Sequence, residues 1–229
     1  MSAIKALIFD VDGTLAETEE VHREAFNKTF LEAGIDWHWD QDTYERLLKV
    51  TGGRERMEHH ARLEGLALPD SAALHRVKTK HYSAMISNAA IALRPGVERL
   101  IREAHAAGLT LAIATTTSRP NVDSLIAATL GRDVISWFAA ICCGEDVRAK
   151  KPDPEVYQLA LDLLGEAPEH CLAFEDSANG LRAANAAGLR CIITPGVYTA
   201  RDDFTGAAAK FDDLSDEAAS LPTLLERFG

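Results

Sequence analysis

Short apolar runs alternate with amphipathic helical patterns along most of the chain. The apolar runs are KALIFD from residue 5, TLAIATT at 110–116, AAICC at 139–143, CLAFE at 171–175 and CIIT at 191–194. Strands separated by helices form parallel crossovers, and a parallel sheet is covered by helices on both faces. The pattern therefore predicts an α/β fold built on a doubly wound parallel sheet.

The first two apolar runs are much further apart than the others. Roughly a hundred residues separate them, whereas later runs start about 20–30 residues apart, as single-helix crossovers require. Helical patterns fill this interval: one helix begins after Thr18, which can cap it, and others are expected at 41–49, 54–64 and 71–87, before Pro95 and Gly96 break the pattern. We predict an all-α domain over 17–91, inserted into a core formed by 1–16 and 92–229.

Composition and charge narrow the possible partners. Apolar residues make up 47% and charged residues 26% of the 229 residues, which is typical of a globular protein. The formal net charge of −11 disfavours binding to nucleic acid or anionic lipid. No apolar run approaches the ~20 residues of a membrane helix, and Asp10 comes too early for a signal peptide. We expect a cytoplasmic monomer with neither nucleic-acid nor membrane partners.

The spacing of the cysteines also fits a cytoplasmic protein. The four cysteines have neither the spacing of a disulfide framework nor that of a zinc site. They are Cys142, Cys143, Cys171 and Cys191. We predict that they are buried thiols.

The first strand runs directly into two carboxylates. Asp10 and Asp12 are two residues apart, so both side chains are expected on one side, and Gly13 permits a sharp turn after them. Ligands of open α/β sheets bind at the carboxyl ends of strands. Two close carboxylates require a cation, a shared proton or both, although an acidic turn that simply ends a strand would look the same.

Three other strands also end in polar residues. Thr115, Thr116 and Thr117 end the second, Lys150-Lys151-Pro152 follows the third, and Glu175-Asp176-Ser177 ends the fourth. Each has an ordinary alternative: a strand-end hydroxyl, a solvated lysine or a helix N-cap. Together they suit phosphoryl transfer. Asp10, Asp176 and Glu175 would hold Mg²⁺, threonine and backbone amides would hold phosphoryl oxygens, and Lys151 would neutralise developing charge.

These motifs resemble those of the haloacid dehalogenase (HAD) superfamily. DVDGT, Thr115, Lys151-Pro152 and Glu175-Asp176 match its four motifs, and the helical insert is similar to its C1-type cap. The resemblance implies a Rossmann-like core in which Asp10 is the nucleophile that forms an aspartyl phosphate. Asp12 would be the general acid and base, with its backbone carbonyl on Mg²⁺. Asp176 would be a metal ligand supported by Glu175.

A narrower resemblance is to the CbbY branch of this superfamily, beside the β-phosphoglucomutases. It is carried by LAETEEVHREAF, DWHWD, TGGRER and FEDSANGLRAANAAG. It implies a phosphatase acting on a sugar phosphate or bisphosphate, such as xylulose 1,5-bisphosphate of the Calvin cycle. The implied substrate-binding residues are Glu19, His22, Tyr44, Gly52, Gly53, Arg54 and Lys78 of the cap and Thr116 and Thr117 of the core. Arg54 or Lys78 would bind the distal phosphate, while Tyr44 could equally belong to the cap interior.

Two other functions stay open at this point. A phosphomutase would share every core residue; Thr14, where β-phosphoglucomutases typically have valine, favours the phosphatase, whereas His22 and Lys78 also suit a mutase. A phospho-accepting signalling domain also combines aspartates, a threonine and a lysine on a parallel sheet. It is disfavoured because its acceptor lies on a later strand and it has no helical insert.

Overall fold

The computed structural model describes residues 4–68, 70–88 and 91–229. A parallel sheet of six strands has the order β3-β2-β1-β4-β5-β6. The strands are β1 (Ala6–Phe9), β2 (Thr110–Ala114), β3 (Phe138–Cys142), β4 (Cys171–Glu175), β5 (Arg190–Ile193) and β6 (Ala209–Lys210). The predicted doubly wound α/β fold is confirmed. The sequence pattern misses β6, because two residues are too few to show a period.

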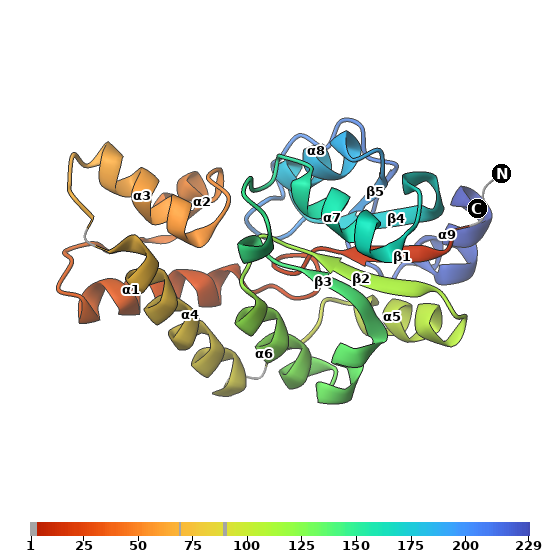
Figure 1. Cartoon of the computed structure of the whole chain (residues 1–229), viewed down its shortest axis with the longest axis horizontal. Helices are drawn as coiled ribbons and strands as arrows, with labels where there is room; N and C mark the ends of the chain where they lie inside the picture. Colours follow the sequence, from red (N-terminus) through yellow and green to blue (C-terminus); the bar gives the residue numbers. More distant parts are fainter. Residues whose placement is uncertain (1–3, 69, 89–90) are drawn as a thin grey trace.

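Helices cover both faces of the sheet (Figure 1). Those of the core are α5 (Val97–Ala106), α6 (Arg119–Thr129), α7 (Glu155–Leu164), α8 (Ala178–Ala186) and α9 (Leu221–Phe228). Short 3-10 turns lie at Arg132–Trp137, Gly144–Asp146, Pro168–His170 and Glu217–Ala219. Helix α9 lies at the end of the molecule away from the helices between β1 and β2 (Figure 1).

Alternation along each strand divides the core into two layers of different bulk. Leu7 and Phe9 of β1 pack with α5, α6 and α9, among other large apolar side chains. Ala6 and Ile8 point the other way and pack with α7 and α8, where alanine and cysteine prevail in the neighbouring strands. Successive strand residues face opposite sides, so one continuous apolar run supplies both layers. All four cysteines are buried and free, as predicted.

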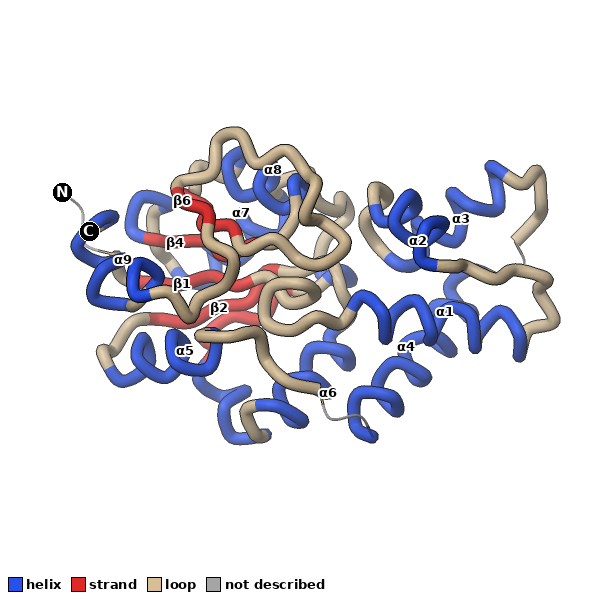
Figure 2. The backbone as a smooth tube through the Cα atoms, turned by 180° about the vertical axis from the view of Figure 1, so that it is seen from behind, coloured by secondary structure: helices blue, strands red, loops and turns tan. Residues whose placement is uncertain are grey.

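The remaining helices form a separate group between β1 and β2 in the sequence. They are α1 (Glu19–Glu32), α2 (Gln41–Leu48), α3 (Gly53–Leu63) and α4 (Ser71–Asn88). Phe26, Phe30 and Trp39 centre an apolar cluster of their own, distinct from the two layers of the core. Figure 2 shows these helices beyond one end of the sheet. The exact division at 17–91 stays a prediction, and residues 1–3, 69 and 89–90 of the two predicted ranges lie outside the described residues.

Arg94 lies where the chain returns from the insert to the core, and its side chain contacts several loops of the core. The Arg94 guanidinium donates to the carbonyl oxygens of Gly13, Thr194 (2.7 Å) and Pro195 (2.8 Å). It also forms an ion pair with Glu17, at 3.4 Å. Arg94 therefore ties both crossings between core and insert to the loops that follow β1 and β5.

Candidate active site

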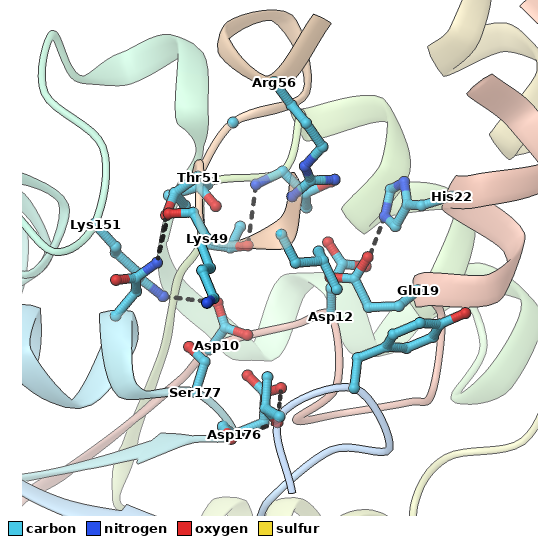
Figure 3. A pocket seen from close by; sticks show the side chains of 18 of the residues that line it. Asp10, Asp12, Glu19, His22, Lys49, Thr51, Arg56, Lys151, Asp176 and Ser177 are labelled. Atoms are coloured by element: carbon cyan, nitrogen blue, oxygen red, sulfur yellow. Dashed lines mark hydrogen bonds and ion pairs between the residues drawn. The ribbon is translucent and has the colours of Figure 1, made fainter. Parts of the chain in front are cut away.

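A cavity of about 480 Å³ lies between the carboxyl ends of the strands and the helical insert. Figure 3 shows Asp10 and Asp176 on its core side, with His22 and Arg56 of the insert across from them. The predicted residues that line it are Asp10, Asp12, Glu19, His22, Gly52, Gly53, Lys78, Thr115, Thr116, Thr117, Lys151, Glu175 and Asp176. Tyr44 and Arg54 are the predicted residues that do not.

Lys151 connects the ends of β1 and β4. Its ammonium donates to Asp10 Oδ1 (2.7 Å), Glu175 Oε1 (2.6 Å) and the carbonyl oxygen of Ala114 (2.8 Å). Burial alone would lower the Lys151 pKa, but the two carboxylates outweigh it and raise the pKa above its usual range. Lys150, the neighbouring candidate, instead donates to the carbonyl oxygens of Gly144 and Val147.

For Asp10, the nearby Lys151 does not compensate for burial. Burial raises its pKa to about 8, and the nearby Glu175 carboxylate adds to this, although Lys151 acts the other way. The same two effects, burial and neighbouring carboxylates, hold the Asp176 pKa well above its usual range. The site therefore has less positive charge than its carboxylates require.

A cation would supply that charge. One oxygen each of Asp10, Glu175 and Asp176 lie within 4.8 Å of one another. Glu175 Oε1 is occupied by Lys151 and by the Tyr157 hydroxyl (2.6 Å), whereas Glu175 Oε2 is buried without a hydrogen-bond partner among the described residues. Three carboxylate oxygens suit a hard divalent cation such as Mg²⁺, so the residues present fit the metal.

Gly13 allows the β1 loop to approach this cluster closely. Its φ of +81° suits glycine, and a Cβ at this position would overlap the Asp176 carboxylate. Its N–H donates to the carbonyl oxygen of Ala16 at 2.9 Å. The turn that the sequence predicts at Gly13 therefore has a second purpose, the close approach of β1 and β4 ends.

Asp12 points away from the carboxylate cluster and toward the insert. Its Oδ1 accepts from the Thr18 hydroxyl (2.5 Å) and from His22 Nε2 (2.9 Å). Lys78 is hydrogen-bonded to His22 Nδ1, so the Nε2 proton is free to donate to Asp12. Burial opposes ionisation of Asp12, but these donors outweigh it and lower its pKa; burial lowers the pKa of Lys78 to about 7.

This arrangement corrects one local expectation. Thr18 precedes α1, as predicted, but its side chain does not cap the helix. The Thr18 backbone (φ −109°, ψ −5°) lacks the extended conformation of a side-chain N-cap, and its hydroxyl donates to Asp12. By contrast, Ser177 does cap α8, accepting from the N–H of Gly180 at 3.1 Å.

The threonines that end β2 form a small hydrogen-bonded group. Thr115 is buried, and its Oγ1 accepts from the N–H of Thr117 at 3.2 Å. The Thr117 hydroxyl in turn accepts from Asn121 Nδ2 at 2.9 Å. Asn121 of α6 thus holds this strand end at the cavity.

Arg54 lies outside the cavity, whereas Tyr44 follows the alternative expectation, the interior of the insert. Tyr44 is fully buried in the insert, where its hydroxyl donates to Glu19 Oε2 (2.7 Å) and accepts from Arg56 Nη1 (2.9 Å). The Arg54 side chain is 54% exposed and pairs with Glu58 at 2.8 Å. Residues two positions apart on a helix point in directions about 200° apart, so only one of Arg54 and Arg56 can face the cavity. In this structure it is Arg56.

Several lining residues were missed by the sequence analysis. They come from the α2–α3 connection, from α3, α4 and α8 and from the loop after β5, and include Lys49, Thr51, Arg56, His75, Arg182, Tyr198, Thr199 and Arg201. For the last three, Pro195-Gly196 directly after an apolar run is a usable signal, because it marks the carboxyl end of another parallel strand. The others depend on how the insert sits over the core.

The insert touches the core across the cavity. Asn179 Nδ2 of α8 donates to the carbonyl oxygen of Lys49 (3.3 Å) and to Thr51 Oγ1 (3.1 Å). The loop before α3 therefore lies against the helix that follows Asp176. A ligand in the cavity would be enclosed by both parts of the chain.

Comparison with known proteins places this geometry in a family. Residues 4–188 match the family model of haloacid dehalogenase-like hydrolases. Protein CbbY from Rhodobacter capsulatus is 52% identical over 224 residues, which are 96% of this chain and 99% of that protein. Protein CbbY from Cereibacter sphaeroides is 50% identical, over 93% of this chain and 94% of that protein.

A solved structure agrees. A mutant of CbbY from Rhodobacter sphaeroides, in complex with xylulose-(1,5)bisphosphate, has a TM-score of 0.93 and 48% identity to this chain. The match covers 96% of this chain and 99% of that one.

Proposed function

Since the chain belongs to the haloacid dehalogenase-like hydrolase family and is a phosphatase of it, we propose that its substrate is a sugar bisphosphate, such as xylulose 1,5-bisphosphate. The observation that carries the phosphatase chemistry is the buried Lys151, hydrogen-bonded to both Asp10 and Glu175 at the edge of the sheet. The similarity to CbbY proteins supports the choice of substrate.

We assign the nucleophile to Asp10. Its carboxylate attacks phosphorus, an aspartyl phosphate forms, and the bond between phosphorus and the sugar oxygen breaks. Lys151 and the Thr115 hydroxyl hold the phosphoryl oxygens during transfer. A Mg²⁺ ion held by Asp10, Asp176 and Glu175 would neutralise the carboxylates and the phosphoryl charge. The predicted contact of this ion with the backbone carbonyl of Asp12 belongs to the same proposal.

Asp12 serves in both steps. As an acid it gives its proton to the departing sugar oxygen, and as a base it takes a proton from the water that cleaves the aspartyl phosphate. The hydrogen bonds from His22 and Thr18 stabilise the ionised, basic form. The acidic form is favoured when an anionic phosphoryl group arrives beside Asp12, because nearby negative charge raises a carboxyl pKa.

The second phosphate would lie against the insert. We propose Arg56 and Lys78 for this contact, because both line the cavity and both are buried. Gly52 and Gly53, at the start of α3 beside them, let backbone approach the ligand. Glu19 and His22 would face the sugar, and Thr116 and Thr117 would face the phosphoryl group.

Replacing Arg56 with methionine should lower kcat/KM for a sugar bisphosphate more than for the corresponding sugar monophosphate. Arg54→Ala is the comparison variant, and an equal effect there would show that Arg54 turns into the cavity when substrate binds.

The central experiment is an assay of sugar monophosphates and bisphosphates with Mg²⁺. Inorganic phosphate and isomerised sugar phosphate are measured together, with and without a bisphosphate activator. We expect phosphate release, fastest from a ketopentose bisphosphate. Isomerised product with little free phosphate would identify a phosphomutase, which the Lys78–His22–Asp12 contacts also suit.

The same proposal covers the setting of the enzyme. No helix within the described ranges is long and apolar enough to cross a membrane. The four buried free thiols fit a reducing compartment, so we propose a cytoplasmic enzyme. That it is a monomer stays a prediction.

A further inference from the structure

Tyr198 belongs to the core but packs into the insert. It lies in the loop after β5, yet its ring packs against the apolar cluster of Phe26, Tyr44 and neighbouring insert residues. The Tyr198 and Tyr44 rings meet edge to face, with 5.7 Å between centroids and an interplanar angle of 80°. Among the described residues of this cluster and those packed on it, Tyr198 is the one that comes from the core.

A hydrogen bond accompanies this packing. The Tyr198 hydroxyl donates to Glu20 Oε2 in the first turn of α1, at 2.6 Å. Glu20 also pairs with Arg23, whose Nη1 donates to the carbonyl oxygen of Trp39 at 2.8 Å. One core side chain is thereby joined to two segments of the insert.

The next residue is bound to the opposite side of the cavity. Thr199 Oγ1 lies 2.8 Å from the carbonyl oxygen of Asp176 and 3.0 Å from its Oδ2. The same oxygen accepts from the N–H of Gly196 at 2.9 Å. Adjacent residues of one short loop therefore contact the insert and the carboxylate cluster.

Tyr44 extends the connection to the cavity wall. Its hydroxyl is hydrogen-bonded to Glu19, which lines the cavity, and its ring is the surface on which Tyr198 rests. A shift of Tyr198 would alter the distance between Glu19 and Asp176, because Tyr198 is the side chain of this loop that packs into the insert among the described residues. The other contact of the loop with the insert is the Val197 N–H, which donates to Glu17 Oε2 at 3.4 Å.

We propose that Tyr198 is a positioning residue that sets the insert over the reacting carboxylates and thereby determines selectivity for sugar phosphates. The inference rests on the proposed function, since it concerns how that substrate is held. Tyr198 acts through Glu20 and Tyr44 and takes no part in the chemistry itself.

The first test compares two substrates in three variants. Tyr198→Ala removes ring and hydroxyl, Tyr198→Phe removes only the hydroxyl, and Val197→Ala, at a neighbouring position that is 74% exposed, is the control. The substrates are xylulose 1,5-bisphosphate and p-nitrophenyl phosphate, which has no sugar for the insert to contact. We expect Tyr198→Ala to raise KM for the bisphosphate about tenfold, corresponding to the loss of one packed and hydrogen-bonded side chain.

The ratio between substrates decides the outcome. The loss of kcat/KM in Tyr198→Ala should be at least about fivefold greater for the bisphosphate than for p-nitrophenyl phosphate, with Tyr198→Phe intermediate. Val197→Ala should match the wild type. Equal losses on both substrates, or no loss on either, would overturn the proposal.

The second test needs no substrate. Amide hydrogen exchange should become faster in the first turn of α1 and at residues 196–199 of Tyr198→Ala, and should not change within α7. Unchanged exchange at α1 would contradict the positioning role. If the wild type hydrolyses no sugar phosphate, the proposed function fails, while this measurement still decides whether Tyr198 joins the two parts of the chain.

Discussion

At the scale of single residues, the site is built from charges that only partly balance. Lys151 has two carboxylate partners, whereas within the described part of the chain Asp176 has no partner of opposite charge, only the Thr199 hydroxyl. Burial and the neighbouring Glu175 carboxylate raise the pKa of Asp10 to about 8, although Lys151 lowers it. Substitution of one of these carboxylates should therefore affect turnover and stability differently.

Asp10→Asn should abolish turnover, with a loss of roughly 1000-fold or more, because the amide cannot attack phosphorus. The fold should be retained, since the substitution keeps the size of the side chain and removes a buried charge. Phosphate release and thermal unfolding are measured on the same preparation. Asp133→Asn, at an exposed position, is the matched control, and substantial activity in Asp10→Asn would refute the nucleophile assignment.

His75 should make stability depend on pH. Burial lowers its pKa from 6.5 to about 4, and nearby Lys78 and His22 add to this effect. Between these two values the unfolded chain binds the proton more readily, so the contribution is present above pH 6.5 and is lost as pH falls toward 4. Urea unfolding of the wild type should lose on the order of 2 kcal/mol more than His75→Gln between pH 7 and pH 5. Identical pH dependence in both proteins would contradict this explanation.

Residues at strand ends could be predicted, whereas those set by helix rotation could not. Asp10, Thr115, Lys151 and Asp176 were expected together because parallel strands end at one edge of the sheet. The sequence cannot show which of Arg54 and Arg56 faces inward, because that depends on how α3 rotates against α4. Thr18 was expected to cap α1 because the sequence pattern does not reveal its backbone conformation, which is not that of a side-chain N-cap.

At the scale of elements, the β1 loop depends on one glycine. Gly13 has a positive φ and lies where a Cβ would overlap Asp176; Gly34 has a similar φ of +66° with nothing near it. Alanine at either position should cost on the order of 1–2 kcal/mol of unfolding free energy because of the backbone strain. Only Gly13→Ala should also lower kcat, by roughly tenfold or more, because it would displace a catalytic group.

Chemical denaturation and steady-state kinetics of the two glycine variants would check this. A normal kcat in Gly13→Ala would mean that the loop can move away from Asp176 without harm. A loss of kcat in Gly34→Ala would show that stability alone explains the effect.

Elements with a clear period were predictable, and those without one were not. The five longer strands and the helices of the insert lie close to the expected ranges. β6 has two residues, and its position follows from pairing with β5 alone. The loop carrying Tyr198 has no period either, and its place is fixed by contacts to residues far away in the chain.

At the scale of the whole molecule, a cation should stabilise the fold. Mg²⁺ at ~100 times its Kd should add about 2.7 kcal/mol, which is a rise of roughly 5 °C or more in Tm for a chain of this size. The rise should be reversed by a chelator and should shrink at lower pH, because the raised pKa values of Asp10 and Asp176 make protons compete with the metal. Asp176→Asn should lose the rise, whereas Asp133→Asn should keep it; a full rise in Asp176→Asn would place the ion elsewhere.

The strand order has a consequence for how this protein is made. β1 carries Asp10 and emerges from the ribosome first, yet both of its neighbours, β2 and β4, are synthesised at least about a hundred residues later. The apolar β1 segment therefore stays unpaired during much of translation, when it can aggregate or bind chaperones. The nascent chain gains its catalytic centre only near the end of synthesis, so any fragment that stops before β4 should be inert.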